Sequence, residues 1–383
     1  MINKIKELRR DLHKFPELSG QEKETAKRIK SFVEIHNKTE IVEGIGGYGL
    51  AVVYSFSGQG PVVMIRCELD ALPIHEKSSK EFKSLQKGIS HSCGHDGHMA
   101  IVAGLIIWIK EQSFKNGKII LLFQPSEETG KGANDVLNDP KFKALKPDYI
   151  FALHNIPGEP MHSILTKENS YTATVQSLAI YLTGKESHAS EPEQGINPAM
   201  EIAEIIKKFE SLNNIVPRSD KFALITPIHM KLGQKAYGIS AGSAELHYTV
   251  RTWSEEEMNG LKAEIQNIVT RVCGTRNVKF KIDWFDYFPK VINDSFCNNT
   301  ISHAAKENNF ELKEMDIPFK FGEDFGWFSH AYKVAMFGIG AGVKSPALHH
   351  PEYDFPDELI ETGMSMLKSV IKRMLTLRDF KDC

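Results

Sequence analysis

Four nearly continuous apolar runs constrain the fold of this chain more than any other feature of its sequence. The runs are PVVMIRC (61–67), KIILLF (118–123), YIFAL (149–153) and VAMFGI (334–339). Strands with one face in water alternate apolar and polar residues, whereas continuous apolar runs of this length are typical of parallel strands that are buried on both faces. An apolar helical segment, 97–110, separates the first two runs. We therefore predict an α/β domain with a mixed, mainly parallel sheet.

The hydrophobic pattern changes at about residue 172. Three segments beyond it alternate apolar and polar residues, as strands with one exposed face do: 174–184, 243–253 and 277–285. Helical patterns that begin near Asn197 and Ser254 separate them. This β-α-β-α-β order predicts a small α+β domain, 172–285, inserted into a larger domain formed by 1–171 and 286–383.

The size and charge of the chain narrow its functional class. A length of 383 residues exceeds what one hydrophobic core usually supports, so two domains are expected. A formal net charge of −2, without a basic stripe rich in aromatic residues, argues against partners such as nucleic acid or an anionic membrane. Two amphipathic helical patterns (3–17 and 20–35) open the chain without the apolar core of a secretory signal, and no apolar run reaches transmembrane length.

The cysteines indicate a reducing compartment. There are five, an odd number, and they are widely scattered: Cys67, Cys93, Cys273, Cys297 and Cys383. This distribution argues against a disulfide framework, so we expect a cytoplasmic protein.

Chemically capable side chains follow the carboxyl end of each of the four apolar runs. They are Glu68 and Asp70, then Glu127 and Glu128, then His154, and finally His349 and His350. The motif HSCGHDGH (91–98) adds three histidines, an aspartate and a cysteine. Ligand sites of open α/β sheets form outside the carboxyl ends of the strands. We therefore predict that HSCGHDGH is one side of a metal site whose other ligands come from strand ends.

Thiolate, imidazole and carboxylate ligands together suit zinc or a neighbouring first-row metal. More ligands are available than one tetrahedral ion needs, which favours two ions that share a ligand. Of the pair Glu127 and Glu128, one carboxylate can bind metal while the other takes a proton from the attacking water. Neighbours on an extended backbone point to opposite sides, so we expect the two side chains to diverge.

Each of these residues also has a plainer interpretation. Cys93 alone would more often be an inert buried thiol, and adjacent glutamates usually form a solvated turn. His154 could be a hydrogen-bonded structural residue, and His98, one helical turn after His95, fits either a ligand or a packed side chain. The coincidence of all these signals at strand ends favours the metal site over a redox cysteine or a polar loop.

Nine segments, in order along nearly the whole chain, carry a resemblance to a known family. They are RRDLHKFPELSGQE, RCELDALPIHE, HSCGHDGHMA, FQPSEETGKGA, ALHN, GKESHASEP, TVRTW, GEDFGWFS and LHHPEYDFPDE. The chain resembles the di-zinc aminoacylase and hippuricase family, whose relatives include carboxypeptidase G and succinyl-diaminopimelate desuccinylase. Within it, the chain is most similar to the amidohydrolase branch of auxin-conjugate hydrolases and N-acetyl-diaminopimelate deacetylases.

The resemblance implies a di-metal catalytic domain and a lid domain that often dimerises. Carried over residue by residue, it implies five metal ligands, with Cys93 as the bridge: Cys93, His95, Glu128, His154 and His349. Glu127 matches the general acid/base and Asp70 a residue that orients a histidine ligand. His188 matches a lid histidine that stabilises the oxyanion, commonly in the partner subunit's site, and Arg251 matches a lid arginine that meets the substrate carboxylate. The implied cofactors are two divalent ions per subunit, zinc first, with manganese, cobalt or nickel as alternatives.

Four positions depart from the pattern of the branch. Glu68 and Leu69 stand where aspartate and methionine are usual, and Glu68 is longer than aspartate by one methylene, which changes where its carboxylate accepts a hydrogen bond. Tyr248 replaces a glycine before TVR. His350 follows His349 where a small or polar residue is common, which leaves His350 as an alternative ligand.

The expected activity is metal-dependent hydrolysis of the amide bond of a small-molecule N-acyl amino acid, which releases a carboxylate and a free amino acid. The expected assembly is a homodimer or a higher homo-oligomer. One alternative is a dipeptidase or carboxypeptidase with the same machinery. A more distant alternative is a non-catalytic, metal-dependent binding protein on the same scaffold, which the presence of Glu127 disfavours.

Overall fold

The computed structural model describes residues 1–376, so Cys383 lies outside the described residues. The chain forms two compact units. The first combines Met1–Tyr171, Val291–Asp316 and the chain from Glu323 onward, and the second combines Thr172–Lys290 with Ile317–Gly322. The second unit therefore extends five residues beyond the predicted end at 285 and includes a short segment that the sequence pattern did not reveal.

The first unit is built on an eight-stranded sheet with the order β1-β2-β4-β3-β5-β16-β6-β15. The strands are β1 (Glu40–Ile45), β2 (Gly49–Ser55), β3 (Gly58–Glu68), β4 (Asn116–Gln124), β5 (Tyr149–Ile156), β6 (Ile164–Thr166), β15 (Leu312–Glu314) and β16 (Lys333–Gly340). The four predicted strands are the central ones, β4, β3, β5 and β16, and each pairs in parallel with its neighbour. Antiparallel pairs of β1 with β2, β2 with β4 and β6 with β16 flank them. The prediction of a mixed, mainly parallel sheet is confirmed.

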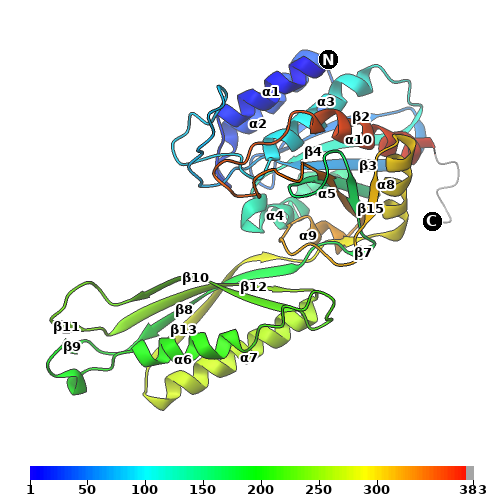
Figure 1. Cartoon of the computed structure of the whole chain (residues 1–383). Coiled ribbons are helices and arrows are strands. Elements are labelled where there is room, and N and C mark those ends of the chain that lie inside the picture. The colour runs from blue at the N-terminus through cyan, green and yellow to red at the C-terminus, as the bar shows by residue number, and fades with distance from the viewer. Residues whose placement is uncertain (377–383) are drawn as a thin grey trace. The chain divides into compact units, whose positions relative to one another are not determined.

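Helices cover both faces of this sheet (Figure 1). One face forms the main core with α1 (Ile2–Lys14), α2 (Lys23–His36), α3 (His95–Lys110), α8 (Ser295–Glu307) and α10 (Leu359–Thr376). On the other side, three short helices pack together: α4 (Gly132–Asn138), α5 (Pro140–Leu145) and α9 (Gly326–Ser329). Of these, α4 contacts β4 and α9 contacts β16. Alternate residues of β4 serve the two faces, with Ile119, Leu121 and Phe123 in the main core. A small ladder of β7 (Asn169–Ser170) with β14 (Ile292–Asn293) completes the unit.

The second unit is a four-stranded antiparallel sheet with the order β10-β12-β8-β13. Its strands are β8 (Thr174–Thr183), β10 (Ala223–Leu232), β12 (Ser243–Thr252) and β13 (Lys279–Phe288), and its helices, α6 (Ala199–Glu210) and α7 (Glu255–Thr275), pack on one face of the sheet (Figure 1). Two-residue strands β9 (Ser187–His188) and β11 (Ile239–Ser240) pair with each other, and a single 3-10 turn covers Pro192–Gln194. Tyr248, in the position where a glycine is usual, packs its ring 5.1 Å from that of Phe209.

Three strands of six or more residues were not predicted, and neither were the strands of two or three residues. β1 and β2 are joined by the glycine-rich turn at 46–47, and β10 lies at the edge of its sheet, where Pro227 breaks the register. Among residues 1–376, no helix is both long enough and apolar enough to cross a membrane.

Candidate metal centre

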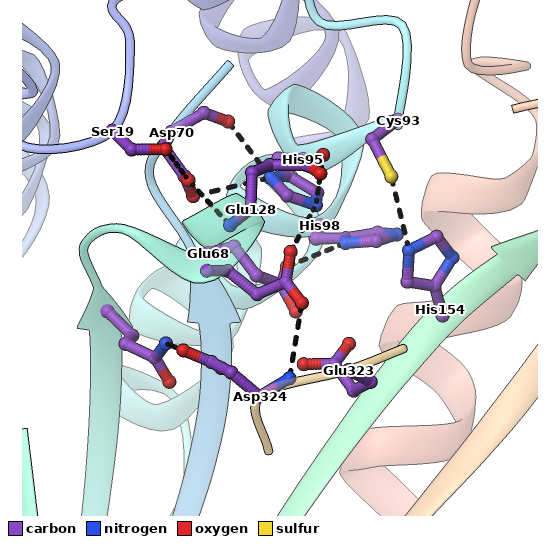
Figure 2. A network of polar contacts seen from close by, with 12 residues as sticks. Ser19, Glu68, Asp70, Cys93, His95, His98, Glu128, His154, Glu323 and Asp324 are labelled. Carbon is purple, nitrogen blue, oxygen red and sulfur yellow. Dashed lines mark hydrogen bonds and ion pairs between the residues drawn. The ribbon is translucent and has the colours of Figure 1, made fainter. Parts of the chain in front are cut away.

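Side chains suited to metal binding gather at the carboxyl ends of the central strands of the first unit (Figure 2). Glu68 is the last residue of β3, and His154 lies near the end of β5. A loop after β3 leads to Cys93 and to His95, which opens α3. Gly94, with φ of +93°, passes so close to β5 that an added Cβ would lie 2.4 Å from Asn155 Oδ1. A residue at this position must adopt a positive φ and must lack a Cβ, and only glycine meets both conditions. The close approach of Gly94 to β5 therefore fixes the position of His95, the first residue of α3.

The five predicted ligands lie together. Cys93 Sγ is 3.5 Å from His154 Nε2, and the ligand atoms of Cys93, His95 and His154 all lie within 4.8 Å of one another. Cys93 also forms a second such triplet with Glu128 and His349, whose Nε2 lies 3.7 Å from Glu128 Oε1. Two triplets therefore share one thiol.

The ring orientations suit a cation. His95 Nδ1 donates to the backbone oxygen of Asp70 at 2.9 Å, and His154 Nδ1 donates to the backbone oxygen of Asn155 at 2.8 Å. Each bond places the ring proton on Nδ1 and leaves the Nε2 lone pair for a metal. Within residues 1–376, the buried atoms His95 Nε2 and Glu128 Oε1 have no hydrogen-bond partner. Buried acceptors without donors are what a divalent ion satisfies, so these residues fit a metal.

The electrostatics of the cluster agree with this fit. Burial, followed by Glu128 and Glu127, raises the pKa of the Cys93 thiol. Burial, offset in part by His95, raises the pKa of Glu128 to about 7. Buried acceptors without a cation hold their protons, whereas a divalent ion among them favours thiolate and carboxylate.

The two adjacent glutamates do not lie on extended backbone, and that expectation was wrong. Ser126 has a left-handed φ of 57°, and Glu127–Thr129 form one turn of 3-10 helix directly afterwards. The turn brings both carboxylates to the same side, where Glu127 Oε2 and Glu128 Oε1 are each 3.9 Å from His95 Nε2. The two side chains differ instead in their other neighbours.

Glu127 lies deeper in the first unit. Its Oε1 accepts a hydrogen bond from the backbone N–H of Asp324 at 3.3 Å. Burial, then the charges of Glu323 and Glu128, raises its pKa well above the usual carboxyl range. Glu127 and Glu128 share a possible ligand group with His95, and Glu128 also joins the triplet with Cys93 and His349.

Asp70 contacts several segments of the centre (Figure 2). Asp70 Oδ1 lies 3.6 Å from His95 Nδ1, whereas the backbone oxygen of Asp70 lies 2.9 Å from the same nitrogen. Its Oδ2 accepts hydrogen bonds from Ser19 Oγ at 2.7 Å and from the backbone N–H of Glu128 at 2.9 Å. Asp70 therefore reaches one predicted ligand by its main chain and another by its carboxylate.

His98 and Glu68 form a supporting pair. His98 Nδ1 lies 2.7 Å from Glu68 Oε2, and its Nε2 lies 2.5 Å from Asn155 Oδ1. Both ring nitrogens are thus engaged, which favours the packed interpretation of His98 over ligation. The unusual Glu68 does make its hydrogen bond.

Of the two adjacent histidines, the geometry favours His349. It has a left-handed φ of 64°, and its backbone N–H donates to Ser92 O at 2.9 Å, which ties it to the loop of Cys93. His350 Nδ1 instead accepts from the backbone N–H of Glu352 at 3.2 Å.

A buried charge cluster beside Glu127 was missed in the sequence. The side chain of Arg66 is fully buried and forms ion pairs with Glu68, with Glu323 at 2.9 Å and with Asp324 at 2.7 Å. An arginine inside an otherwise apolar strand was the available signal, because a buried guanidinium needs carboxylate partners.

His188 and Arg251 belong to the second unit. The exposed His188 accepts the backbone N–H of Ser190 at Nδ1 (3.2 Å), so its neutral ring carries the proton on Nε2. Arg251, half-buried in β12, uses Nη1 to donate to Lys320 O at 2.9 Å.

Residues 64–373 match the model of the peptidase family M20/M25/M40. The chain belongs to this family. It is 30% identical to N-acetylcysteine deacetylase of Bacillus subtilis over 92% of both chains. It is 31% identical to N-acetyldiaminopimelate deacetylase of the same organism, over 96% of this chain and 97% of that one. A solved dinuclear metal binding peptidase of the M20 family from Bacillus subtilis superimposes with a TM-score of 0.80 and 26% identity, over 98% of this chain and 99% of that one. The predicted family resemblance is confirmed, and so is the prediction of a hydrolase.

Proposed function

We propose that this protein hydrolyses the amide bond of an N-acyl amino acid, releasing a carboxylate and a free amino acid. The observation that carries the proposal is the pair of ligand triplets that share Cys93 in a buried site next to Glu127. The named relatives that are deacetylases of N-acetylated amino acids support this substrate class over a dipeptide.

Two divalent ions fit the two triplets. Cys93 would bridge them, one ion being completed by His95 and His154 and the other by Glu128 and His349. When bound, such ions polarise the scissile carbonyl and lower the pKa of the attacking water. Zinc is the first choice for this thiolate, imidazole and carboxylate set, with manganese, cobalt or nickel as alternatives.

Glu127 would act as general base and then as general acid. It is buried beside the triplets but belongs to neither, and the N–H of Asp324 holds one of its oxygens. The other oxygen is available to take a proton from water and to deliver it to the leaving amine. Asp70 would position His95 and Glu128 through the contacts described above.

Two residues of the second unit would bind the substrate. His188, with its proton on Nε2, can donate to the oxyanion of the tetrahedral intermediate. Arg251 keeps further N–H donors beyond its bond to Lys320, and a guanidinium pairs with a carboxylate through two parallel bonds. We further propose a cytoplasmic homodimer in which His188 serves the partner subunit's site.

The test is an activity screen of metal-loaded protein on matched substrates. N-acetyl amino acids with a free α-carboxylate should be hydrolysed, whereas their carboxamides should be poor substrates because the partner of Arg251 is lost. Arg251→Lys should reduce the preference for the free acid, since a lysine cannot form the bidentate pair. Faster hydrolysis of dipeptides than of N-acyl amino acids would support the peptidase alternative.

A further inference from the structure

The N-terminal motif RRDLHKFPELSGQE (9–22) has no part in the function proposed above, and it lies outside the residues matched by the family model. Four of its side chains nevertheless contact segments that carry the proposed ligands. We call these four the N-terminal brace: Arg9, His13, Ser19 and Glu22.

Arg9 joins two ligand segments. Its side chain is fully buried, and its Nε donates to Asp96 Oδ2 at 2.7 Å, next to His95 in sequence. Its Nη2 donates to Asp354 and its Nη1 lies 3.4 Å from Asp357, both in the segment that follows His349. One planar guanidinium with donors on three nitrogens thus connects the start of α3 to the His349 segment.

His13 strengthens the first of these connections. Its Nδ1 lies 2.8 Å from Asp96 Oδ2, the oxygen that Arg9 also contacts, and its Nε2 lies 3.3 Å from Glu76. Two side chains of α1 therefore converge on a single carboxylate oxygen between His95 and Gly97. Within residues 1–376, the side-chain hydrogen bonds of Asp96 go to Arg9 and His13 and not to the ligand triplets, so its role is to hold backbone.

Ser19 and Glu22 support the turn that carries Glu128, the carboxylate among the proposed ligands. Ser19 Oγ donates to Asp70 Oδ2, which also accepts the N–H of Glu128 (Figure 2). The buried Glu22 accepts the backbone N–H of Ser126 at 2.8 Å through Oε1. Ser126 has the left-handed conformation that starts the Glu127–Thr129 turn, so Glu22 holds the residue on which that turn depends.

We propose that the N-terminal brace positions the ligand segments of the metal centre and so sets its metal affinity. This inference rests on the proposed metal centre. In the part of the chain that the structure describes, the hydrogen bonds that link the brace to the ligand segments end on Asp96, Asp70, Ser126 and the segment after His349 rather than on ligand atoms, so the four are positioning residues. Partners that orient metal ligands typically contribute about 10- to 100-fold in metal affinity.

The experiment compares each brace variant with the same change at a nearby exposed or partly exposed residue. Arg9→Lys is paired with Arg28→Lys, because Arg28 is partly exposed and its ion pair is with Asp11, which lies outside the ligand segments. Ser19→Ala is paired with Ser31→Ala, an exposed position of α2. Each full-length variant is titrated with cobalt(II) against a competing chelator, and the visible spectrum of the bound cobalt reports ligand geometry. Circular dichroism of the metal-free protein measures folding.

We expect cobalt affinity to fall on the order of 10- to 100-fold in Arg9→Lys, and less in Ser19→Ala, with a changed spectrum in both. The two control variants should match the wild type. Should Arg9→Lys fail to fold, Ser19→Ala decides the matter, because it removes one hydroxyl at a partly exposed position.

Two outcomes would overturn the inference. One is unchanged cobalt affinity and spectrum in the folded brace variants, even where their unfolding temperature falls. The other is an equal loss of affinity in the controls. The cobalt titration contains no substrate, so its result does not depend on the proposed activity. A wild type that binds cobalt but cleaves no N-acyl amino acid in the separate activity screen would overturn the proposed substrate alone. A wild type that binds no cobalt would overturn both proposals.

Discussion

At the scale of single residues, Glu127 and Glu128 have the same side chain but different surroundings. Both carboxylates approach His95 Nε2 to 3.9 Å. Glu128 belongs to the triplet with Cys93 and His349, whereas one oxygen of Glu127 is held by the N–H of Asp324. The distance to His95 is therefore the same for the proposed ligand, Glu128, and the proposed base, Glu127. Their contacts with Cys93, His349 and Asp324 distinguish them.

Substitution by glutamine tests this division, because glutamine keeps the shape of glutamate but cannot act as a base. Glu127→Gln should keep both metals and bind substrate, yet lose on the order of 10²–10⁴ in kcat. Glu128→Gln should bind less metal, and excess zinc should partly restore its activity. Metal analysis of both purified variants beside their kcat values provides the measurement. Metal loss in Glu127→Gln but not in Glu128→Gln would mean that the two roles are reversed.

His13 gives a prediction for stability against pH. Burial alone would lower its pKa, but Asp96 and Glu76 outweigh burial and raise the pKa from 6.5 to about 9. The folded state therefore binds a proton that the unfolded state releases between these values. The stabilisation is complete below about pH 6.5 and disappears as the pH rises through 9; it is on the order of 3 kcal/mol.

The measurement is the free energy of unfolding of the wild type and of His13→Gln at pH 6 and at pH 9.5. The loss caused by the substitution should be larger at pH 6, by about 2–3 kcal/mol. Using the difference between two proteins cancels the titration of other groups. A loss of equal size at both pH values would contradict a protonated His13.

Some single residues could be assigned from the sequence and others could not. The reactive side chains at strand ends were predictable because strand direction alone places them at one edge of the sheet. The partners of Arg66 were not, because Glu323 and Asp324 lie more than 250 positions away and only the folded chain brings them together. The same is true of Arg9 with Asp354.

At the scale of elements, the strands that are buried on both faces were the predictable ones. β3, β4, β5 and β16 leave continuous apolar runs because both of their faces are covered. β10 was missed because it lies at a sheet edge with mostly exposed side chains, and exposure removes the alternating pattern. The turn of 3-10 helix at Glu127 was missed because its cause is a backbone conformation, the left-handed φ of Ser126.

The junction between the ligand loop and α3 gives a prediction at this scale. Gly94→Ala adds a Cβ that would meet Asn155 Oδ1 at 2.4 Å, at a φ of +93° that alanine rarely adopts. The loop must then move, so stability should fall by about 1–3 kcal/mol and metal affinity should fall with it. Gly260→Ala is the control, because this glycine lies in α7 with open space around it, and alanine there should stabilise by up to about 1 kcal/mol.

Thermal unfolding and metal titration of the two variants provide the comparison. If Gly94→Ala unfolds at the temperature of the wild type and binds metal normally, the close approach does not determine where His95 lies.

At the scale of the whole molecule, the residues proposed for catalysis and binding lie in two units. All five proposed metal ligands and Glu127 lie in the first unit, whereas His188 and Arg251 lie in the second. The order of elements predicted the insertion, but the return of Ile317–Gly322 to the second unit could not be predicted, because six residues carry too little pattern. The proposed role of His188 therefore has two forms, action within its own chain and action on the partner subunit.

Mixing two inactive variants distinguishes these cases. Glu127→Gln lacks the base but keeps His188, and His188→Ala lacks the oxyanion donor but keeps an intact metal centre. If His188 serves the partner subunit's site, a hybrid dimer has one site with both Glu127 and His188, and that site should be active. With random exchange of equal amounts, half of the dimers are hybrids and each carries one complete site, so about a quarter of wild-type activity should return. If His188 serves its own subunit, every site in the mixture lacks one of the two residues and no activity returns.

Mass spectrometry of differently tagged subunits establishes that exchange has occurred. An inactive mixture with demonstrated hybrids would show that His188 acts within its own chain.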